Sequence, residues 1–183
     1  MTFNVIDRRI EGAEDEGTDD ADTFERCLMR TTPVGPITHE QLQVIRAGEA
    51  SGILLGGTMT QLAGSLGTPY AFDPPGGCVL FLEEVGERPY RVDRLFTQLL
   101  QAGVIGRASA LVFGEMPRCD EPGGMPAIRK VVADLTRDFP GPVLFGLPSG
   151  HTSGATLTLP FGVRARVVAN AHPSLVIEES AVE

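Results

Sequence analysis

Apolar and polar residues come in alternating blocks along the middle of the chain. Residues 79–82 form a continuous apolar run of the kind found in a strand covered on both faces, and 110–113 and 143–145 are similar. Between these runs, apolar residues follow helical spacing from Pro89 to the stop at Gly103 and again over 126–139. Two consecutive strand–helix–strand units predict parallel strands joined by right-handed crossovers.

Shorter elements are expected on either side of this block. Asp22 or Thr23 can cap a helix over 24–30, and a second helix is expected over 58–66. Further strands are predicted at 41–46, 51–55, 155–160, 163–169 and 175–178, the last three antiparallel to one another. The predicted fold class is therefore α/β, with a small parallel sheet and its helices plus a second, antiparallel sheet.

Length and composition favour one soluble domain. The 183 residues, 42% of them hydrophobic, are enough for one well-packed core. No apolar run approaches the roughly 20 residues that a membrane-spanning helix needs, and residues 1–20 lack the features of a signal peptide. The three cysteines are an odd number without metal-type spacing. We expect a cytoplasmic protein without membrane contact.

The net charge of −9 is concentrated near the start of the chain. Eight acidic residues and no Lys or Arg lie between Glu11 and Glu25, so the rest of the chain is nearly neutral. Clustered basic side chains, which phosphate binding requires, are lacking, and this argues against nucleic acid as a partner. We expect the acidic stretch 11–22 to be a solvated, mobile loop, with an interaction tail as the alternative.

Candidate catalytic residues follow the three apolar runs. Glu83 and Glu84 come directly after the first run, Glu115 after the second and His151 shortly after the third. Ligand sites of open parallel sheets lie at the carboxyl ends of the strands, so these side chains are expected at one edge. A His paired with a carboxylate is the base and orienter of a nucleophilic hydrolase. The alternative is that the acid only provides a favourable charge near a helix N-terminus and that the His is only a turn residue.

The acids at this edge are not equivalent. Glu84 is expected on the opposite side of the strand from Glu83, and Glu87 can pair with Arg91 four residues on. A metal site built from Glu83, Glu115 and His151 is disfavoured, because the ligands would come from three loops without helical ligand spacing. Glu83 and His151 are the favoured pair.

Several motifs resemble the C-terminal domain of the LD-carboxypeptidase family. They are Gly52-Ile-Leu-Leu-Gly-Gly-Thr-Met-Thr, Leu66-Gly-Thr-Pro-Tyr, Leu80-Phe-Leu-Glu-Glu-Val-Gly-Glu-Arg-Pro-Tyr-Arg-Val-Asp-Arg-Leu, Gly146-Leu-Pro-Ser-Gly-His and Leu157-Thr-Leu-Pro-Phe-Gly. That family includes muramoyl-tetrapeptide carboxypeptidases and microcin-C immunity peptidases. The resemblance implies a swivelling β/β/α-type domain over 38–183, preceded by an acidic arm, 1–37, similar to the family's interdomain segment.

The resemblance also implies a Ser–His–Glu triad built across two domains. The family's Glu falls on Glu83 and its His on His151, whereas the nucleophilic Ser has no counterpart and its domain would precede Met1. Substrate contacts are assigned to Gly57, Thr58 and Glu115. Thr58 stands where the family commonly has Asn, which puts a role for that side-chain amide in doubt.

Residues inside the chain are weak substitutes for the missing nucleophile. Ser149 and Ser153 flank His151 without a Gly-x-Ser-x-Gly elbow and are expected to serve the turn. Cys119 follows the second apolar run, and a catalytic role for it is disfavoured. His39 and His172 lie away from the predicted edge.

The resulting hypothesis is the C-terminal half of a serine LD-carboxypeptidase that cleaves a C-terminal D-amino acid from muropeptides. It needs no metal or cofactor, and alone it is expected to be inactive. The nucleophile domain would act in trans. Whether the chain forms a homodimer is left open. The alternatives are a non-catalytic paralogue that binds muropeptides and a gene fragment. In a structure, we expect Glu83 and His151 within hydrogen-bonding or single-water distance in an exposed cleft, and an apolar docking surface nearby.

Overall fold

The computed structural model describes residues 21–183, so most of the acidic stretch 11–22 lies outside the described residues. The helices are α1 (Ala21–Met29), α2 (Met59–Ser65), α3 (Pro89–Gln101) and α4 (Ile128–Leu135), with a short 3-10 turn at Ile105–Arg107. The strands are β1 (Gly35–Ile37), β2 (Gln43–Arg46), β3 (Gly48–Thr58), β4 (Cys78–Glu83), β5 (Ala108–Gly114), β6 (Val143–Leu147), β7 (Arg164–Ala169) and β8 (Ser174–Ile177).

One long strand joins the two predicted sheets. The first part of β3 pairs antiparallel with β7, and its last five residues pair parallel with β4. The eight strands in the described part of the chain therefore form one mixed sheet in the order β1-β8-β7-β3-β4-β5-β6-β2. The predicted α/β class, with parallel β4, β5 and β6 beside antiparallel strands, is confirmed.

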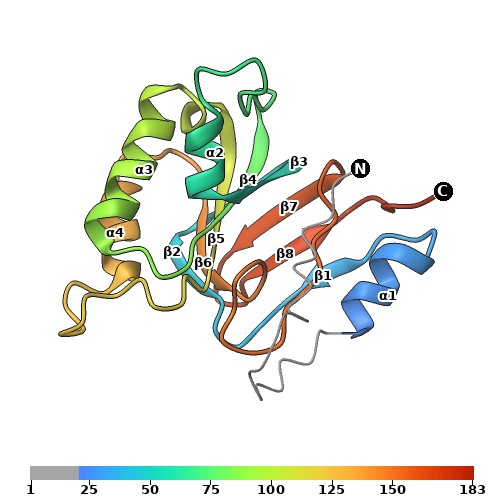
Figure 1. Ribbon diagram of the computed structural model, residues 1–183. Coiled ribbons are helices and arrows are strands. Elements are labelled where there is room, and N and C mark those ends of the chain that lie inside the picture. The colour runs from blue at the N-terminus through green and yellow to red at the C-terminus, as the bar shows by residue number, and fades with distance from the viewer. Residues whose placement is uncertain (1–20) are drawn as a thin grey trace, which may run out of the picture.

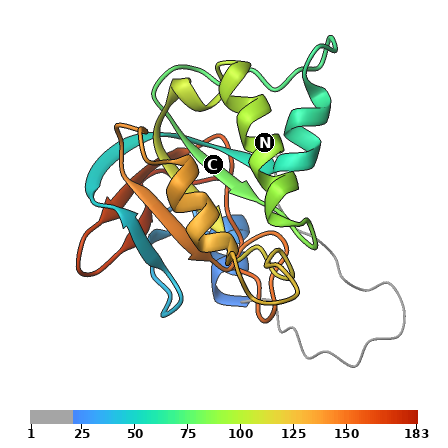
Figure 2. The ribbon, with the colours of Figure 1, turned by 90° about the vertical axis from the view of Figure 1, so that its left-hand side faces the viewer.

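Strand β4 is buried along its whole length and divides the core into two parts. Cys78, Leu80 and Leu82 belong to the cluster that includes residues of α2, α3 and α4, whereas Val79 and Phe81 belong to the cluster on the other face. Both views place these three helices together on one side of the parallel strands, with α1 apart from them against β1 (Figure 1, Figure 2). By alternation, Glu83 shares the face of Val79 and Phe81.

The prediction of a strand at 155–160 is wrong, because the structure has an irregular segment there with a single bridge residue at Pro160. Its backbone groups bond to a loop and to a helix instead of to a neighbouring strand. Leu157 N–H donates to Pro148 O at 2.7 Å, Thr158 N–H donates to Thr23 Oγ1 at 3.1 Å, and Cys27 Sγ lies 3.6 Å from Thr158 O. Side chains of α1 provide hydrogen-bond partners for this backbone in place of the neighbouring strand that the apolar pattern predicted.

Part of the predicted arm 1–37 is built into this core. Cys27 of α1 and Val34 are buried, and β1 pairs antiparallel with β8 at the sheet edge. The boundary at residue 37 stays a prediction. Within residues 21–183, no helix combines the length and the apolar character that crossing a membrane requires.

Glu84, which directly follows β4, has a structural role on the helix side of the sheet. Its side chain is 3% exposed, and its Oε2 accepts hydrogen bonds from Thr60 N–H at 2.9 Å and Thr60 Oγ1 at 2.7 Å. Thr60 lies in the first turn of α2, where backbone N–H groups have no intrahelical acceptor. The prediction that Glu84 points away from Glu83 is confirmed, and Glu84 caps α2.

Replacing Glu84 by Ala should destabilise the domain by about 1–2 kcal/mol, because the first turn of α2 loses the carboxylate that caps it through the backbone N–H and hydroxyl of Thr60. Urea unfolding measures the free-energy difference. Glu87→Ala is the matched control: it removes a partly exposed i,i+4 pair with Arg91 at 3.2 Å, worth about 0.5 kcal/mol or less. Equal stability of Glu84→Ala and the native chain would contradict the capping role.

Candidate functional site

Glu83 and His151, 68 residues apart in sequence, are in direct contact. Glu83 ends β4, and His151 lies four residues beyond the end of β6. The Nδ1 atom of His151 is 2.8 Å from Glu83 Oε2, and the backbone N–H of His151 donates to the same oxygen at 3.1 Å. The predicted contact is confirmed, and it lies at the carboxyl edge of the parallel strands where it was expected.

The carboxylate of Glu83 is fully buried, which requires hydrogen-bond donors around it. Thr58, at the end of β3, faces Glu83 in the parallel β3–β4 pair, and its hydroxyl donates to Glu83 Oε1. The other oxygen takes the two donors of His151. Because a carboxylate accepts only, the Nδ1 atom of a neutral His151 carries the proton.

His151 is thereby left with a basic nitrogen that faces outward. Its side chain is 30% exposed, and within residues 21–183 the Nε2 atom has no hydrogen-bond partner. An imidazole held through Nδ1 by a buried carboxylate and free at Nε2 can take a proton from a hydroxyl within hydrogen-bonding distance of that nitrogen.

Two glycines give the Glu83 side chain its space. Gly150 has φ +78°, and a Cβ there would lie 2.7 Å from Glu83 Cγ and 2.8 Å from Cδ. A Cβ on Gly114, at the end of β5, would lie 2.9 Å from Glu83 Cβ. Real Cβ atoms do not approach other atoms this closely, so a larger residue at position 150 requires the Glu83 side chain or the loop to shift.

The three predicted substrate residues take different positions. Thr58 is bonded to Glu83, so it orients the acid of the pair. Gly57 is its neighbour in β3, and a Cβ there would meet no atom within 4 Å, which leaves open space beside the site. Glu115 is not bonded to the pair; its Oε2 accepts from Ser153 N–H at 2.8 Å, two residues after His151.

Two of the internal alternatives to a nucleophile, Ser149 and Cys119, are buried, whereas Ser153 is exposed and its backbone N–H donates to Glu115. Ser149 is fully buried and its hydroxyl donates to Leu157 O at 2.9 Å, which agrees with the predicted role in the turn. Cys119 is buried as well, and burial raises the pKa of its thiol to about 11, so little thiolate forms near neutral pH. His39 and His172 form local turn contacts with Gln41 and Asn170, and the structure shows no bond of either to Glu83 within residues 21–183.

Sequence reasoning missed a hollow beside the loop that carries His151. It has a volume of about 260 Å³ and is lined by Gln41, Gln43, Glu115, Phe145, Gly146 and Ser153. Gln41 and Gln43 lie two residues apart in a predicted strand, so both side chains point to the same face. This pair of amides was the sequence feature that could have indicated the hollow. The hollow joins β2, β6 and the loop after β5.

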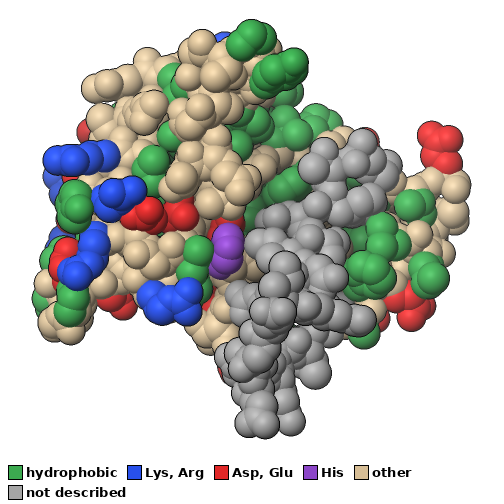
Figure 3. Space-filling view, in the orientation of Figure 1, with side chains coloured by type: hydrophobic (Ala, Val, Ile, Leu, Met, Phe, Trp, Pro, Cys, Tyr) green, Lys and Arg blue, Asp and Glu red, His purple; other side chains and the backbone are tan. Residues whose placement is uncertain are grey.

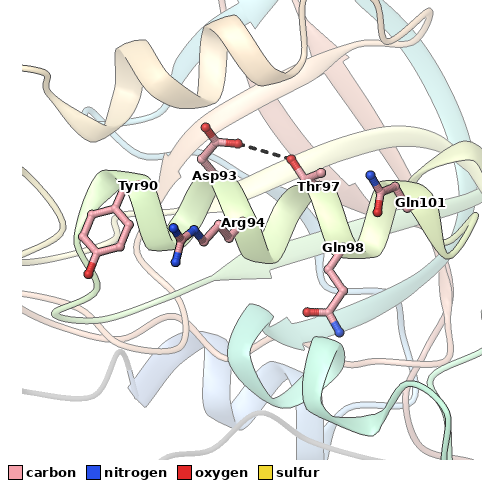
Figure 4. Close-up of a pocket in the computed structure, with 6 residues that line it drawn as sticks. All are labelled: Tyr90, Asp93, Arg94, Thr97, Gln98 and Gln101. Atoms are coloured by element: carbon pink, nitrogen blue, oxygen red, sulfur yellow. Dashed lines mark hydrogen bonds between the residues drawn. The ribbon is translucent and has the colours of Figure 1, made fainter.

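A larger hollow, of about 410 Å³, lies on the outer surface of α3. All six side chains that line it come from this one helix, and Asp93 there accepts a hydrogen bond from Thr97 at 3.2 Å (Figure 4). A depression over a single helix lacks the converging groups from several elements that a binding site needs. In the described part of the chain, no three His, Cys, Asp or Glu side chains are grouped as metal ligands.

An α/β domain with a carboxylate-oriented histidine at the carboxyl edge of its parallel strands has the arrangement found in nucleophilic hydrolases. Residues 51–167 match the family model described as the LD-carboxypeptidase C-terminal domain. This match covers more than half of the chain, so the chain belongs to the LD-carboxypeptidase family.

Individual relatives agree with this assignment. A carboxypeptidase-like protein of Streptomyces coelicolor is 41% identical over 123 residues, which cover 67% of this chain and 38% of the relative. The crystal structure of muramoyltetrapeptide carboxypeptidase from Oxalobacter formigenes has a TM-score of 0.70 and 30% identity, over 87% of this chain and 54% of that one.

A second solved structure has a similar fold at lower identity. The microcin C7 self-immunity protein in complex with glutamyl sulfamoyl guanosine has a TM-score of 0.79 and 22% identity, over 89% of this chain and 56% of that chain. The present chain therefore spans about half, or less, of the length of the proteins that it matches.

Substituting Gly150 by Ala should destabilise the domain by about 2–3 kcal/mol and separate Glu83 from His151, because the new methyl group collides with the carboxylate at a positive φ. Urea unfolding gives the stability, and the NMR signal of the His151 ring reports the contact. Gly154→Ala is the control, since a Cβ there meets nothing within 4 Å. Equal stability of the two variants would show that the close packing of Gly150 is unimportant.

Proposed function

We propose that this chain supplies the base and the orienter of a serine LD-carboxypeptidase that removes a C-terminal D-amino acid from muropeptides. The observation that carries the proposal is the 2.8 Å contact between His151 Nδ1 and the buried carboxylate of Glu83. Membership of the LD-carboxypeptidase family supports the reaction class. The nucleophilic Ser is assigned to a domain outside these 183 residues.

In this mechanism His151 moves a proton twice. Its Nε2 takes the proton of the attacking serine hydroxyl and then gives it to the nitrogen of the departing D-amino acid, which leaves an acyl-enzyme. Water then attacks the acyl group, His151 takes one proton from that water, and the proton returns to the serine oxygen as the peptide acid is released. The imidazole is neutral at the start and at the end of the cycle.

Glu83 and Thr58 keep His151 ready for both transfers. While His151 holds the extra proton, the carboxylate of Glu83 stabilises the imidazolium, and its hydrogen bond to Nδ1 fixes the ring orientation. The hydroxyl of Thr58 fixes the second oxygen of the carboxylate. Thr58 stands where the family commonly has Asn, and in this proposal its hydroxyl positions the carboxylate.

The substrate would enter from the open side of the pair. Gly57 leaves space next to Thr58, and the peptide carbonyl would have to lie in open space within reach of His151 Nε2. The name of the Oxalobacter formigenes structure, muramoyltetrapeptide carboxypeptidase, favours a muropeptide as the substrate class.

A nucleophile domain acting in trans needs a docking surface on this chain. Exposed large apolar side chains are spread over α1, the loop after α2, α3 and the loop before α4: Phe24, Met29, Tyr70, Tyr90, Leu100 and Met125. Figure 3 shows hydrophobic side chains over α1 and over the loop between α2 and β4. A continuous apolar docking patch beside the site stays a prediction.

Reconstitution tests the proposal. The chain alone should release no D-alanine from an LD-tetrapeptide, because a base without its nucleophile accelerates little. The chain mixed with, or fused to, the part of the Streptomyces coelicolor relative that it does not match should gain metal-independent release. In that pair, His151→Ala should lower kcat about 10⁴-fold, and Glu83→Gln should lower it by a similar order.

His172→Ala and Glu87→Gln are the matched controls, since both residues lie outside the pair, and they should leave release unchanged. Two results would overturn the proposal: release by the chain alone that Ser149→Ala or Cys119→Ala abolishes, or a reconstituted pair that is active with His151→Ala. If the assembled pair binds the tetrapeptide without cleaving it, the chain is a muropeptide-binding paralogue.

A further inference from the structure

Helix α1 buries two side chains against the irregular segment 155–160. Thr23 and Cys27 lie four residues apart on one face of the helix, and their side chains are 5% and 0% exposed. The end of the helix is tied to the C-terminal tail, because Ser180 Oγ donates to Arg30 O at 3.1 Å. α1 is therefore fixed to the domain both along its inner face and just beyond its last residue.

Both buried side chains bond the backbone of one residue, Thr158. Its N–H donates to Thr23 Oγ1 at 3.1 Å, and Cys27 Sγ lies 3.6 Å from its carbonyl oxygen. Burial raises the pKa of the Cys27 thiol to about 11, so the sulfur keeps its proton near neutral pH and can donate it to that oxygen. Thr158 is 6% exposed, so water has little access to take the place of these partners.

The residue before Thr158 bonds the turn that precedes His151. Leu157 N–H donates to Pro148 O at 2.7 Å, and Leu157 O accepts from Ser149 Oγ at 2.9 Å. Both backbone polar groups of Leu157 thus close the loop that contains His151. Since Leu157 and Thr158 are adjacent, α1 holds one end of this closure from behind.

The position of the loop sets the contact between His151 and Glu83. His151 reaches Glu83 Oε2 through its backbone N–H at 3.1 Å and through Nδ1 at 2.8 Å. A backbone shift of about 1 Å away from Glu83 lengthens both beyond hydrogen-bonding distance. The hydrogen bonds that hold the loop from behind therefore affect the geometry of the pair in front of it.

We propose that Thr23 and Cys27 are positioning residues for His151, which act from α1 through the segment 157–158. The inference rests on the proposed function for the role of His151 as a base, and it adds a part of the structure to that role. The segment that resembles the family's interdomain segment then helps to hold the histidine. When α1 leaves its place, His151 should lose its contact with Glu83.

Native-state hydrogen exchange tests this coupling in the unaltered chain. Exchange of single amides is followed at increasing urea concentrations below the unfolding transition. The amides of Thr158 and His151 should exchange through the same opening as the amide of Cys27 in α1, with protection equal within about threefold and the same urea dependence. The amide of Val112 in β5 should stay protected. A His151 amide that remains protected while α1 opens would overturn the proposal.

Substitutions at Thr23 test the hydrogen bond itself. Thr23→Val keeps the shape of the side chain and removes the acceptor of Thr158 N–H, so protection of the His151 amide should fall about tenfold. Nitrogen-15 NMR should show a larger population of the Nε2–H tautomer of His151. Thr23→Ser keeps a hydroxyl and should retain the native values of both. Glu25→Gln removes an exposed pair with Arg30 and should change neither.

A second control separates positioning from a general loss of stability. Val132→Ala removes two methyl groups from a fully buried residue of α4 in the other part of the core, so it should lower the global stability and leave the His151 tautomer unchanged. Cys27→Ala should act as Thr23→Val does, but more weakly, because a thiol is a weak donor. A native His151 tautomer in a folded Thr23→Val chain, or an equal change in Val132→Ala, would show that α1 has no positioning role.

Activity gives an independent measurement. In the reconstituted pair, Thr23→Val should lower kcat about tenfold and leave KM nearly unchanged, because the base is displaced and the substrate contacts are not. If the native pair releases D-alanine while Thr23→Val leaves His151 unaffected, only the positioning role is wrong. If the coupling is seen in the isolated chain and no release occurs, only the catalytic proposal is wrong.

Discussion

The carboxylate of Glu83 lies in the interior of the domain, and the surrounding structure provides the hydrogen-bond donors that it needs there. Removing a carboxylate from water costs on the order of several kcal/mol unless donors replace its hydration. Here the donors come from two segments that the fold brings together, the hydroxyl of Thr58 at the end of β3 and two N–H groups of His151 after β6. Glycines at 114 and 150 allow the backbone to approach the side chain.

Adjacent glutamates at the end of β4 have separate roles because a strand alternates its faces. Glu83 faces the site and holds His151, while Glu84 faces the helices and caps α2. These two contacts also fix the β3–α2 junction from both sides, since Thr58 bonds Glu83 and Thr60 bonds Glu84. The proposed catalytic pair and the cap of α2 thus depend on neighbouring residues of the same two segments.

Strand-end reasoning located Glu83 and His151 because buried parallel strands have continuous apolar runs and their carboxyl ends share an edge. The same reasoning failed at 155–160, where an apolar pattern indicated a strand and side chains of α1 took the hydrogen bonds instead. Hydrogen bonds to residues far away in the chain produce no periodic pattern in the local sequence. The sequence also did not predict that β3 joins the two sheets into one, since only five of its eleven residues were predicted as strand. The hollow at Glu115 depends on Gln41 and Gly146 meeting across the sheet edge, which spacing along the chain does not show.

The central claim is that Glu83 fixes the tautomer of His151 and leaves Nε2 free to act as a base. Nitrogen-15 NMR of the imidazole ring measures the tautomer directly, at a pH where His151 is neutral. The account predicts a proton on Nδ1 in the native chain and a shift of the population toward the Nε2–H tautomer in Glu83→Gln, while Glu87→Gln keeps the native spectrum. A native His151 with its proton on Nε2, or a tautomer unaffected by Glu83→Gln, would contradict it.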